Sequence, residues 1–190
     1  MSLRVVQLKT EYVENPLGLD EKKPRLFWRL ESEERGASQS AYRVLVASSK
    51  EALDREEGDR WDSGKVESDR SIHIVYEGKP LVSEGRYYWK VQVWDGQGRP
   101  SAWSETAFWT MGLLDRGEWK AGWIGRKTEP NVGMQPSPFV RKSFAVDGQV
   151  ARATVYATAL GLYELRVNGE KVGDLFAPGF TDYDKRVQVQ

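Results

Sequence analysis

The chain has no cysteine and a single histidine, His73, among its 190 residues. Without cysteine it forms neither disulfides nor cysteine-ligated zinc sites, and one histidine cannot build a multi-histidine metal site within one chain. We therefore expect no metal ion and no cofactor. Strong charge of either sign is also lacking, because 28 Lys and Arg balance 28 Asp and Glu. The basic footprint of a nucleic-acid-binding protein is missing, so we expect no nucleic-acid partner.

Long apolar runs are lacking as well. No stretch approaches the roughly 20 apolar residues that a membrane-spanning helix needs, so we expect no membrane partner. Residues 1–8 lack the charged-then-apolar pattern of a secretory leader. The sequence therefore predicts a cytoplasmic protein, although a leader removed ahead of Met1 would leave the same pattern.

Aromatic residues are plentiful, at 12% of the chain with eight tryptophans, which favours a packed core over disorder. The clearest strand pattern is RYYWKVQVW, residues 86–94, in which aromatic and β-branched residues alternate. One face of this strand would carry Tyr87, Trp89, Val91 and Val93.

Further strand patterns surround this segment at hairpin-like spacing. They are residues 25–31, 41–48, 61–64, 71–76 and 104–111, and residues 50–57 are the one helix-like stretch. In residues 71–76 we expect Ile72, Ile74 and Tyr76 on one face. A single antiparallel β-sandwich over residues 1–112 accounts for this spacing.

A linker at residues 112–117 and a Pro-containing polar loop at residues 127–138 lead into a second set of strand patterns. Asn168-Gly169 is the strongest short hairpin signal, and Pro178-Gly179 predicts another turn. The expected strands are residues 139–146, 151–157, 161–167, 170–173 and 186–190. We interpret residues 113–190 as a partial second β-sandwich and the chain as a piece of a longer protein, because unpaired strand edges are an aggregation liability.

Trp28, Leu81, Gly85 and Tyr87 make the first region resemble a fibronectin type III domain. Such domains bury a tryptophan on an early strand. Their tyrosine corner ties the start of a strand to nearby backbone through the tyrosine hydroxyl. The resemblance implies a fibronectin type III-like antiparallel β-sandwich.

Ordered segments along the chain carry a more specific resemblance. They are EYVENPLGLD, PRLFWRLES, RGASQSAYRVLVASS, WDSGKVES, GRYYWKVQVWD, SAWSE, MGLL, WKAGWI, ALGLYELRVNGEKVGD and PGFTDYDKR. With these segments the chain resembles the N-terminal region of bacterial α-L-rhamnosidases. The resemblance implies an all-β chain in which a partial jelly-roll or galactose-binding-like β-sandwich follows the first sandwich.

In that family a large (α/α)₆ barrel follows these sandwiches, carries the catalytic carboxylates and releases terminal α-L-rhamnose by inverting hydrolysis. None of the family's catalytic residues has a matching position in this chain. The resemblance therefore implies a non-catalytic accessory segment, whose partner is the downstream catalytic barrel of the same parent chain.

Aromatic side chains are the candidates for sugar binding by ring stacking. We single out Trp94, Trp123 and Tyr183, with Trp119 and Phe180 beside them. Packing in a core or between domains is the favoured interpretation for all five, because Trp and Tyr are common interface anchors. Trp119 and Trp123 are expected to pack between the two sandwiches.

No catalytic residue is assigned. Asp182 and Asp184 would be the carboxylates to consider for glycoside hydrolysis, but a solvated loop or an interdomain salt bridge is the favoured interpretation. His73 is interpreted as a solvated or hydrogen-bonded strand residue, and no nucleophile elbow accompanies it. Gly96-Gln97-Gly98 predicts a hairpin turn rather than a dinucleotide site, because Pro100 lies where such a site needs a helix.

Three functions stay open at this point. The favoured one is an accessory and scaffolding segment of a glycosidase. The second is a carbohydrate-binding module that recognises rhamnose-containing glycans, since jelly-roll sandwiches often bind sugars. The third is a protein-interaction module, which rests on fold analogy alone.

Overall fold

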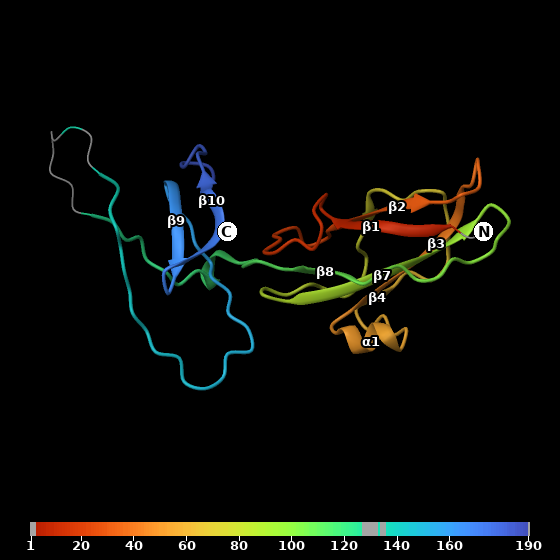
Figure 1. Ribbon diagram of the computed structural model, residues 1–190, viewed down its shortest axis with the longest axis horizontal. Coiled ribbons are helices and arrows are strands. Elements are labelled where there is room, and N and C mark those ends of the chain that lie inside the picture. The colour runs from red at the N-terminus through yellow and green to blue at the C-terminus, as the bar shows by residue number, and fades with distance from the viewer. Residues whose placement is uncertain (1–2, 127–132, 134–135, 190) are drawn as a thin grey trace. The chain divides into compact units, whose positions relative to one another are not determined.

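The computed structural model describes residues 3–126, 133 and 136–189. Contacts between Cα atoms divide the chain into two compact units, Met1–Ala121 and Gly122–Gln190. Two sheets are described in the first unit and one hairpin in the second, and all of their strand pairs are antiparallel (Figure 1). The all-β fold class predicted from the sequence is confirmed, and the domain limits at residues 112 and 113 stay a prediction.

Two antiparallel sheets form the first unit. The smaller sheet has the order β1-β2-β6, with β1 (Arg4–Thr10), β2 (Arg25–Glu31) and β6 (Ile74–Val75). The larger sheet has the order β4-β3-β7-β8, and β5 also pairs with β3. Its strands are β3 (Gln39–Ala47), β4 (Trp61–Asp62), β5 (Val66–Glu67), β7 (Arg86–Asp95) and β8 (Ala107–Thr110).

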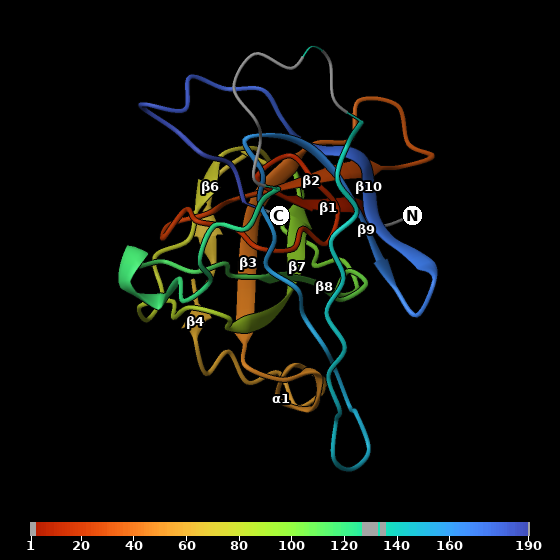
Figure 2. The same ribbon diagram turned by 90° about the vertical axis from the view of Figure 1, so that its left-hand side faces the viewer.

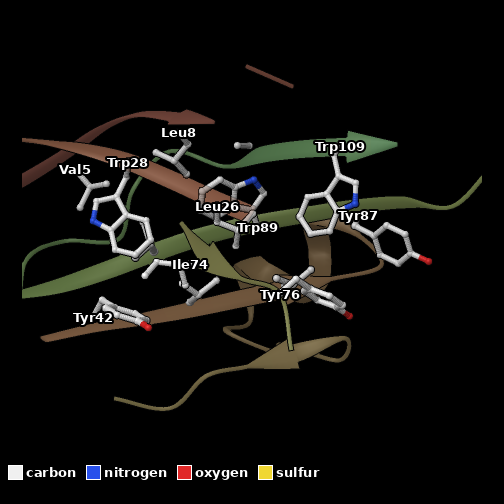
Figure 3. Close-up of a cluster of buried hydrophobic side chains, with 14 of the residues drawn as sticks. Val5, Leu8, Leu26, Trp28, Tyr42, Ile74, Tyr76, Tyr87, Trp89 and Trp109 are labelled. Carbon is white, nitrogen blue, oxygen red and sulfur yellow. The ribbon is translucent and has the colours of Figure 1, made fainter. Parts of the chain in front are cut away.

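The core of this unit lies between the two sheets, which both contribute large side chains to it (Figure 3). The four residues predicted for one face of β7 are all buried there, which confirms that face as the inward one. Trp28 on β2 is buried as well, and its indole N–H donates to Oε1 of Gln39 at 3.0 Å. The predicted early-strand tryptophan is therefore confirmed, with its one polar group satisfied.

The other face of the larger sheet carries the helix α1 (Lys50–Asp54), well separated from β1 and β2 (Figures 1 and 2). Ser49 caps the start of the helix, and Leu53 packs with Leu45 of β3. Nζ of the buried Lys90 donates to the Leu53 carbonyl at 2.5 Å, at the helix end that favours a cation. The short helix predicted within residues 50–57 is confirmed. Among the described residues, no helix has the length and apolarity needed to span a bilayer.

The segment between β1 and β2 runs along the outer edge of β8. Oδ1 of Asn15 accepts the backbone N–H of Phe108 at 2.9 Å, and the Pro16 carbonyl accepts the Thr110 N–H at 3.0 Å. The Gly18 N–H donates to Oγ1 of Thr110 at 2.9 Å. These bonds occupy backbone groups that an open edge strand would offer to other chains.

Strand β1 has no period-two pattern, and the sequence does not predict it. Gln7 has a φ of 48°, and the register against β2 shifts between Val6 and Lys9. Such a bulge interrupts the alternation by which a strand is recognised. Strand β5 is also unpredicted, because two residues are too few to show a period.

The strand predicted at residues 71–76 is wrong in part. Only Ile74–Val75 forms β6, and Ile72 is 54% exposed instead of sharing a buried face with Ile74 and Tyr76. His73 has a φ of 55°, in the left-handed region that strands do not use. The chain therefore turns at His73, and Ile72 falls outside the alternation.

The second unit contains one hairpin among its described residues, formed by β9 (Gly161–Val167) and β10 (Glu170–Gly179). Asn168 and Gly169 join the two strands with φ of 50° and 88°, so the predicted hairpin turn is confirmed. Pro178 and Gly179 continue β10 in register with β9, and the turn predicted there is wrong.

Residues 139–146 and 151–157 form no strand, contrary to the prediction. A strand needs a neighbour for its backbone N–H and C=O groups, and neither segment has a paired strand among the described residues. Residues 186–189 form no strand either. Gln190 lies outside the described residues, as do residues 127–132 and 134–135 of the predicted loop.

Candidate functional site

The tyrosine corner predicted from Leu81, Gly85 and Tyr87 is present at the start of β7. The Tyr87 hydroxyl accepts the backbone N–H of Val82 at 3.0 Å. Gly85 leaves room for this ring, because a Cβ at that position would lie 2.6 Å from the hydroxyl oxygen. The corner thus fixes the backbone just before Arg86, where β7 begins.

Trp94, a candidate for sugar stacking, alternates with the inward residues of β7 and is partly buried. Nζ of Lys65 lies 5.2 Å from the centroid of its ring, which is a cation–π contact. Lys65 is also paired with Glu67 at 2.8 Å. A side chain of the protein itself therefore already contacts this ring.

The other stacking candidates, Trp123 and Tyr183, lie in the second unit. Trp123 is 65% exposed and the neighbouring candidate Phe180 is 77% exposed. The Tyr183 side chain is partly buried, and its hydroxyl has no hydrogen-bond partner among the described residues. Trp119 follows the short 3-10 helix η1 (Arg116–Glu118) at the end of the first unit. Packing of Trp119 and Trp123 between the two sandwiches stays a prediction.

Asp182 and Asp184 are exposed at a turn. Oδ2 of Asp182 pairs with Nζ of Lys185 at 2.8 Å, and the Asp182 carbonyl accepts the backbone N–H groups of Lys185 and Arg186. These contacts confirm the solvated loop favoured from the sequence. The salt bridge is local to the turn, and an interdomain salt bridge stays a prediction.

His73 lies on the surface of the first unit. Its Nε2 and the Tyr12 hydroxyl share a hydrogen bond of 2.8 Å, and its ring meets Phe27 edge-on at 5.1 Å. The interpretation of His73 as a hydrogen-bonded surface residue is therefore confirmed, although its backbone is not that of a strand.

The segment Gly96-Gln97-Gly98 forms a tight turn after β7. Oδ1 of Asp95 accepts the backbone N–H groups of Gln97 and Arg99, each at 2.9 Å. Gly98 has a φ of 76°, which glycine adopts without a steric penalty. The hairpin turn predicted there is confirmed.

Arginine partners hold several carboxyl groups in the ionised form. Arg25 donates to both oxygens of Glu11, and Arg43 donates to both oxygens of Asp62. These bonds lower the pKa of each carboxyl below its usual value. Every described carboxyl with a resolved pKa shift moves in the same direction. Within the described part of the chain, no group of three or more His, Cys, Asp or Glu is placed to hold a metal ion.

A further cluster, which the sequence does not single out, lies on the outward face of β7 and β8. We name it the Arg86 seat and define it as Arg86, Tyr88 and Phe108. Cζ of Arg86 lies 4.0 Å from the Phe108 ring centroid and 5.5 Å from that of Tyr88. Nε of Arg86 is buried and has no hydrogen-bond partner among the described residues. Alternation along β7 gives Arg86 and Tyr88 the same face, but Phe108 joins them only through the β7–β8 register.

Two antiparallel sheets packed over one aromatic core, with a tyrosine corner, define an immunoglobulin-like β-sandwich. A family model described as "Rha78A-like, N-terminal immunoglobulin domain" matches residues 5–115. A second, described as "Alpha-L-rhamnosidase N-terminal domain", matches residues 148–190. The chain belongs to the family of Rha78A-like N-terminal immunoglobulin domains, in the N-terminal region of α-L-rhamnosidases.

Known relatives match almost the whole chain. An α-L-rhamnosidase of Formosa agariphila is 41% identical over 188 residues, which cover 95% of this chain and 20% of that protein. One of Streptomyces avermitilis is 37% identical and matches 90% of this chain and 18% of its own length. The solved structure of α-L-rhamnosidase from Dictyoglumus thermophilum is 39% identical, with a TM-score of 0.87 over 98% of this chain and 23% of that one. The chain thus spans about a fifth of the length of the curated relatives it matches.

Proposed function

We propose that the chain is the non-catalytic N-terminal accessory segment of an α-L-rhamnosidase. In this proposal a downstream (α/α)₆ barrel of the same parent chain carries out inverting hydrolysis, and the segment covers and positions that barrel. The observation that carries the proposal is the second unit, where the described residues form one hairpin and leave most of their apolar side chains exposed. An exposed apolar surface of that kind marks an interaction site.

The carboxyl groups support an accessory role. Inverting hydrolysis needs a general acid with a raised pKa and a base, with the two carboxyl groups about 6.5–9.5 Å apart. The carboxyls of Glu11, Asp62, Glu118 and Glu164 have lowered pKa values, because arginine, lysine or hydroxyl groups bond to their ionised forms. Asp182 is one of the two carboxylates that the sequence offers for hydrolysis. It lies at an exposed turn and forms a salt bridge with Lys185.

Hydrolysis of a chromogenic aryl α-L-rhamnoside tests the proposal. We expect release of rhamnose by the complete protein of this reading frame and none by the 190-residue chain at the same molar concentration. The matched comparison is the complete protein carrying both Asp182→Asn and Asp184→Asn, which should retain its activity. Rhamnose release by the 190-residue chain alone would contradict the accessory role.

Carbohydrate binding is a second candidate function, and the exposed rings of Trp123 and Phe180 favour it. A rhamnose-containing glycan would stack its apolar face on such a ring. Isothermal titration of the chain with L-rhamnose and a rhamnosylated oligosaccharide checks this. Binding that is lost in Trp123→Ala or Tyr183→Ala but kept in Phe139→Ala would support it, and a flat titration at millimolar sugar would reject it.

A further inference from the structure

We propose that the Arg86 seat binds the carboxylate of an Asp or Glu side chain carried by the part of the parent protein that follows residue 190. The inference rests on the proposed accessory function, and it adds the docking surface and the chemistry of the partner group. It concerns a cluster of the first unit that takes no part in the tyrosine corner or in the core.

The state of the Arg86 guanidinium points to a missing acceptor. Of the four partly buried arginines in the described part of the first unit, Arg25 pairs with Glu11 and Arg43 with Asp62, whereas Arg60 bonds only to the Pro80 carbonyl. Arg86 is partly buried too, yet the described residues give its side chain no salt bridge, and its Nε is shielded from solvent without a hydrogen bond. Because Nε is shielded, a carboxylate would reach the guanidinium through its Nη atoms, and a charge-assisted pair there would offset the free-energy cost of partly burying the cation.

The two aromatic rings prepare Arg86 for such a partner. Phe108 and Tyr88 are direct neighbours across β7 and β8, with ring centroids 6.3 Å apart, and both lie within cation–π range of the guanidinium. Contacts with the rings restrict the guanidinium plane before any partner arrives. The planar fork of an arginine held this way matches the two oxygens of a carboxylate.

An exposed apolar side chain on the segment that borders β8 favours a protein surface over a small free acid. Leu17 is 74% exposed, and its neighbours Pro16 and Gly18 are both hydrogen-bonded to Thr110. Thr110 is the cross-strand partner of Arg86. An exposed leucine on one side of Thr110 and an arginine stacked on two rings on the other suit a protein interface, whose core is apolar and enriched in aromatic residues and arginine.

The position of the seat favours the downstream part of the parent as the source. Thr110 is the last residue of β8, so the seat lies at the end of the larger sheet where the chain leaves β8. The relatives extend far beyond the matched region, since this chain covers only 20% of the Formosa agariphila protein. A tethered partner also binds at a high effective concentration, which makes a single charge pair effective.

The test uses the complete protein of this reading frame with a protease site inserted after Ala121. After cleavage, the dissociation of the first piece is followed by size-exclusion chromatography and surface plasmon resonance. We expect the wild-type piece to stay bound and Arg86→Gln to dissociate roughly 30-fold faster or more, because one partner of a shielded charge pair is lost. Arg86→Lys should show an intermediate loss, since lysine cannot bond both oxygens in one plane. Arg35→Gln removes an exposed arginine and should match the wild type.

The other outcomes of the cleavage experiment separate the accessory function from the docking site. A wild-type piece that separates at once would overturn the accessory function and the inference with it. Equal retention of wild type, Arg86→Gln and Arg35→Gln would overturn the inference alone. Retention of the first piece in the 190-residue chain cleaved at the same site would place the partner within residues 122–190 and contradict the proposed source. The melting temperature of the 190-residue Arg86→Gln variant, expected to match that of Arg35→Gln, separates lost docking from lost folding.

Discussion

The two units of this chain differ in how far their apolar side chains are buried. In the first, two sheets face each other, and Trp89 and Trp109 are both 0% exposed. In the second, Ile124 is 78% exposed and Phe144 is 76% exposed, around one hairpin. Sequence composition does not explain this contrast, because both regions contain strand-like patterns with similar residue types.

The contrast shows that a strand pattern becomes a strand only when a partner is present. β7 has β3 on one side and β8 on the other, so its backbone groups and its inward face are satisfied together. Residues 139–146 carry a comparable pattern without a paired neighbour in the described part of the chain. Burial and backbone pairing are therefore gained in the same step, and neither follows from the pattern alone.

The largest expected effect comes from the core of the first unit. Trp89→Ala removes a fully buried ring and should lower the free energy of unfolding by about 3–5 kcal/mol. Urea unfolding followed by circular dichroism measures this loss. A loss below about 1 kcal/mol would mean that the core is not closed as described.

The next largest loss of stability is expected at the tyrosine corner. Gly85→Ala places a Cβ 2.6 Å from the Tyr87 hydroxyl oxygen, and we expect a loss of about 1–3 kcal/mol in the free energy of unfolding. Part of that loss should vanish in a Tyr87→Phe background, because the hydroxyl is then absent. Gly122→Ala is the matched control, since nothing lies within 4 Å of its Cβ position. Strict additivity of the Gly85 and Tyr87 changes would contradict the contact.

The pair of Glu11 and Arg25 is expected to make a smaller contribution to stability, which depends on pH. The bond with Arg25 holds the pKa of Glu11 below its usual value of 4.5. The ionised form is thus favoured by folding, so its stabilisation is present above pH 4.5 and is lost as the pH falls through the lowered pKa.

Acid unfolding of the first unit checks the direction of this pH dependence. Wild type should lose stability relative to Glu11→Gln as the pH falls below 4.5. An acid limb that is the same in wild type and Glu11→Gln would rule out this contribution.

The smallest effect belongs to the second unit and sharpens the contrast with Trp89. Phe144→Ala removes a ring that is 76% exposed, so the free energy of unfolding should change by less than about 0.5 kcal/mol. The same urea titration measures it. A loss comparable to that of Trp89→Ala would show that this ring is buried in solution.

Local chemistry accounts for the parts of the fold that the sequence predicts correctly. β7 alternates aromatic and β-branched residues, and the corner tyrosine Tyr87 lies two residues after Gly85. Asn168-Gly169 forms a two-residue turn because both residues tolerate positive φ. The surface interpretation of His73 and the turn at Gly96 to Gly98 follow from similarly local chemistry.

The features that the sequence does not predict depend on contacts between distant segments. The bulge in β1 hides its period, and the left-handed backbone at His73 removes Ile72 from the buried face. The Arg86 seat requires the register that sets Tyr88 opposite Phe108. None of these can be read from one segment alone, because each is fixed by a neighbouring strand.

Hydrogen–deuterium exchange on the 190-residue chain tests most directly whether the first unit is closed and the second depends on a partner. We predict that amides of β3 and β7 exchange only through global unfolding, while residues 139–146 and 151–157 exchange at close to the rate of an unstructured peptide. Protection of those two segments equal to that of β7 would contradict this, since the second unit would then be complete within the chain itself.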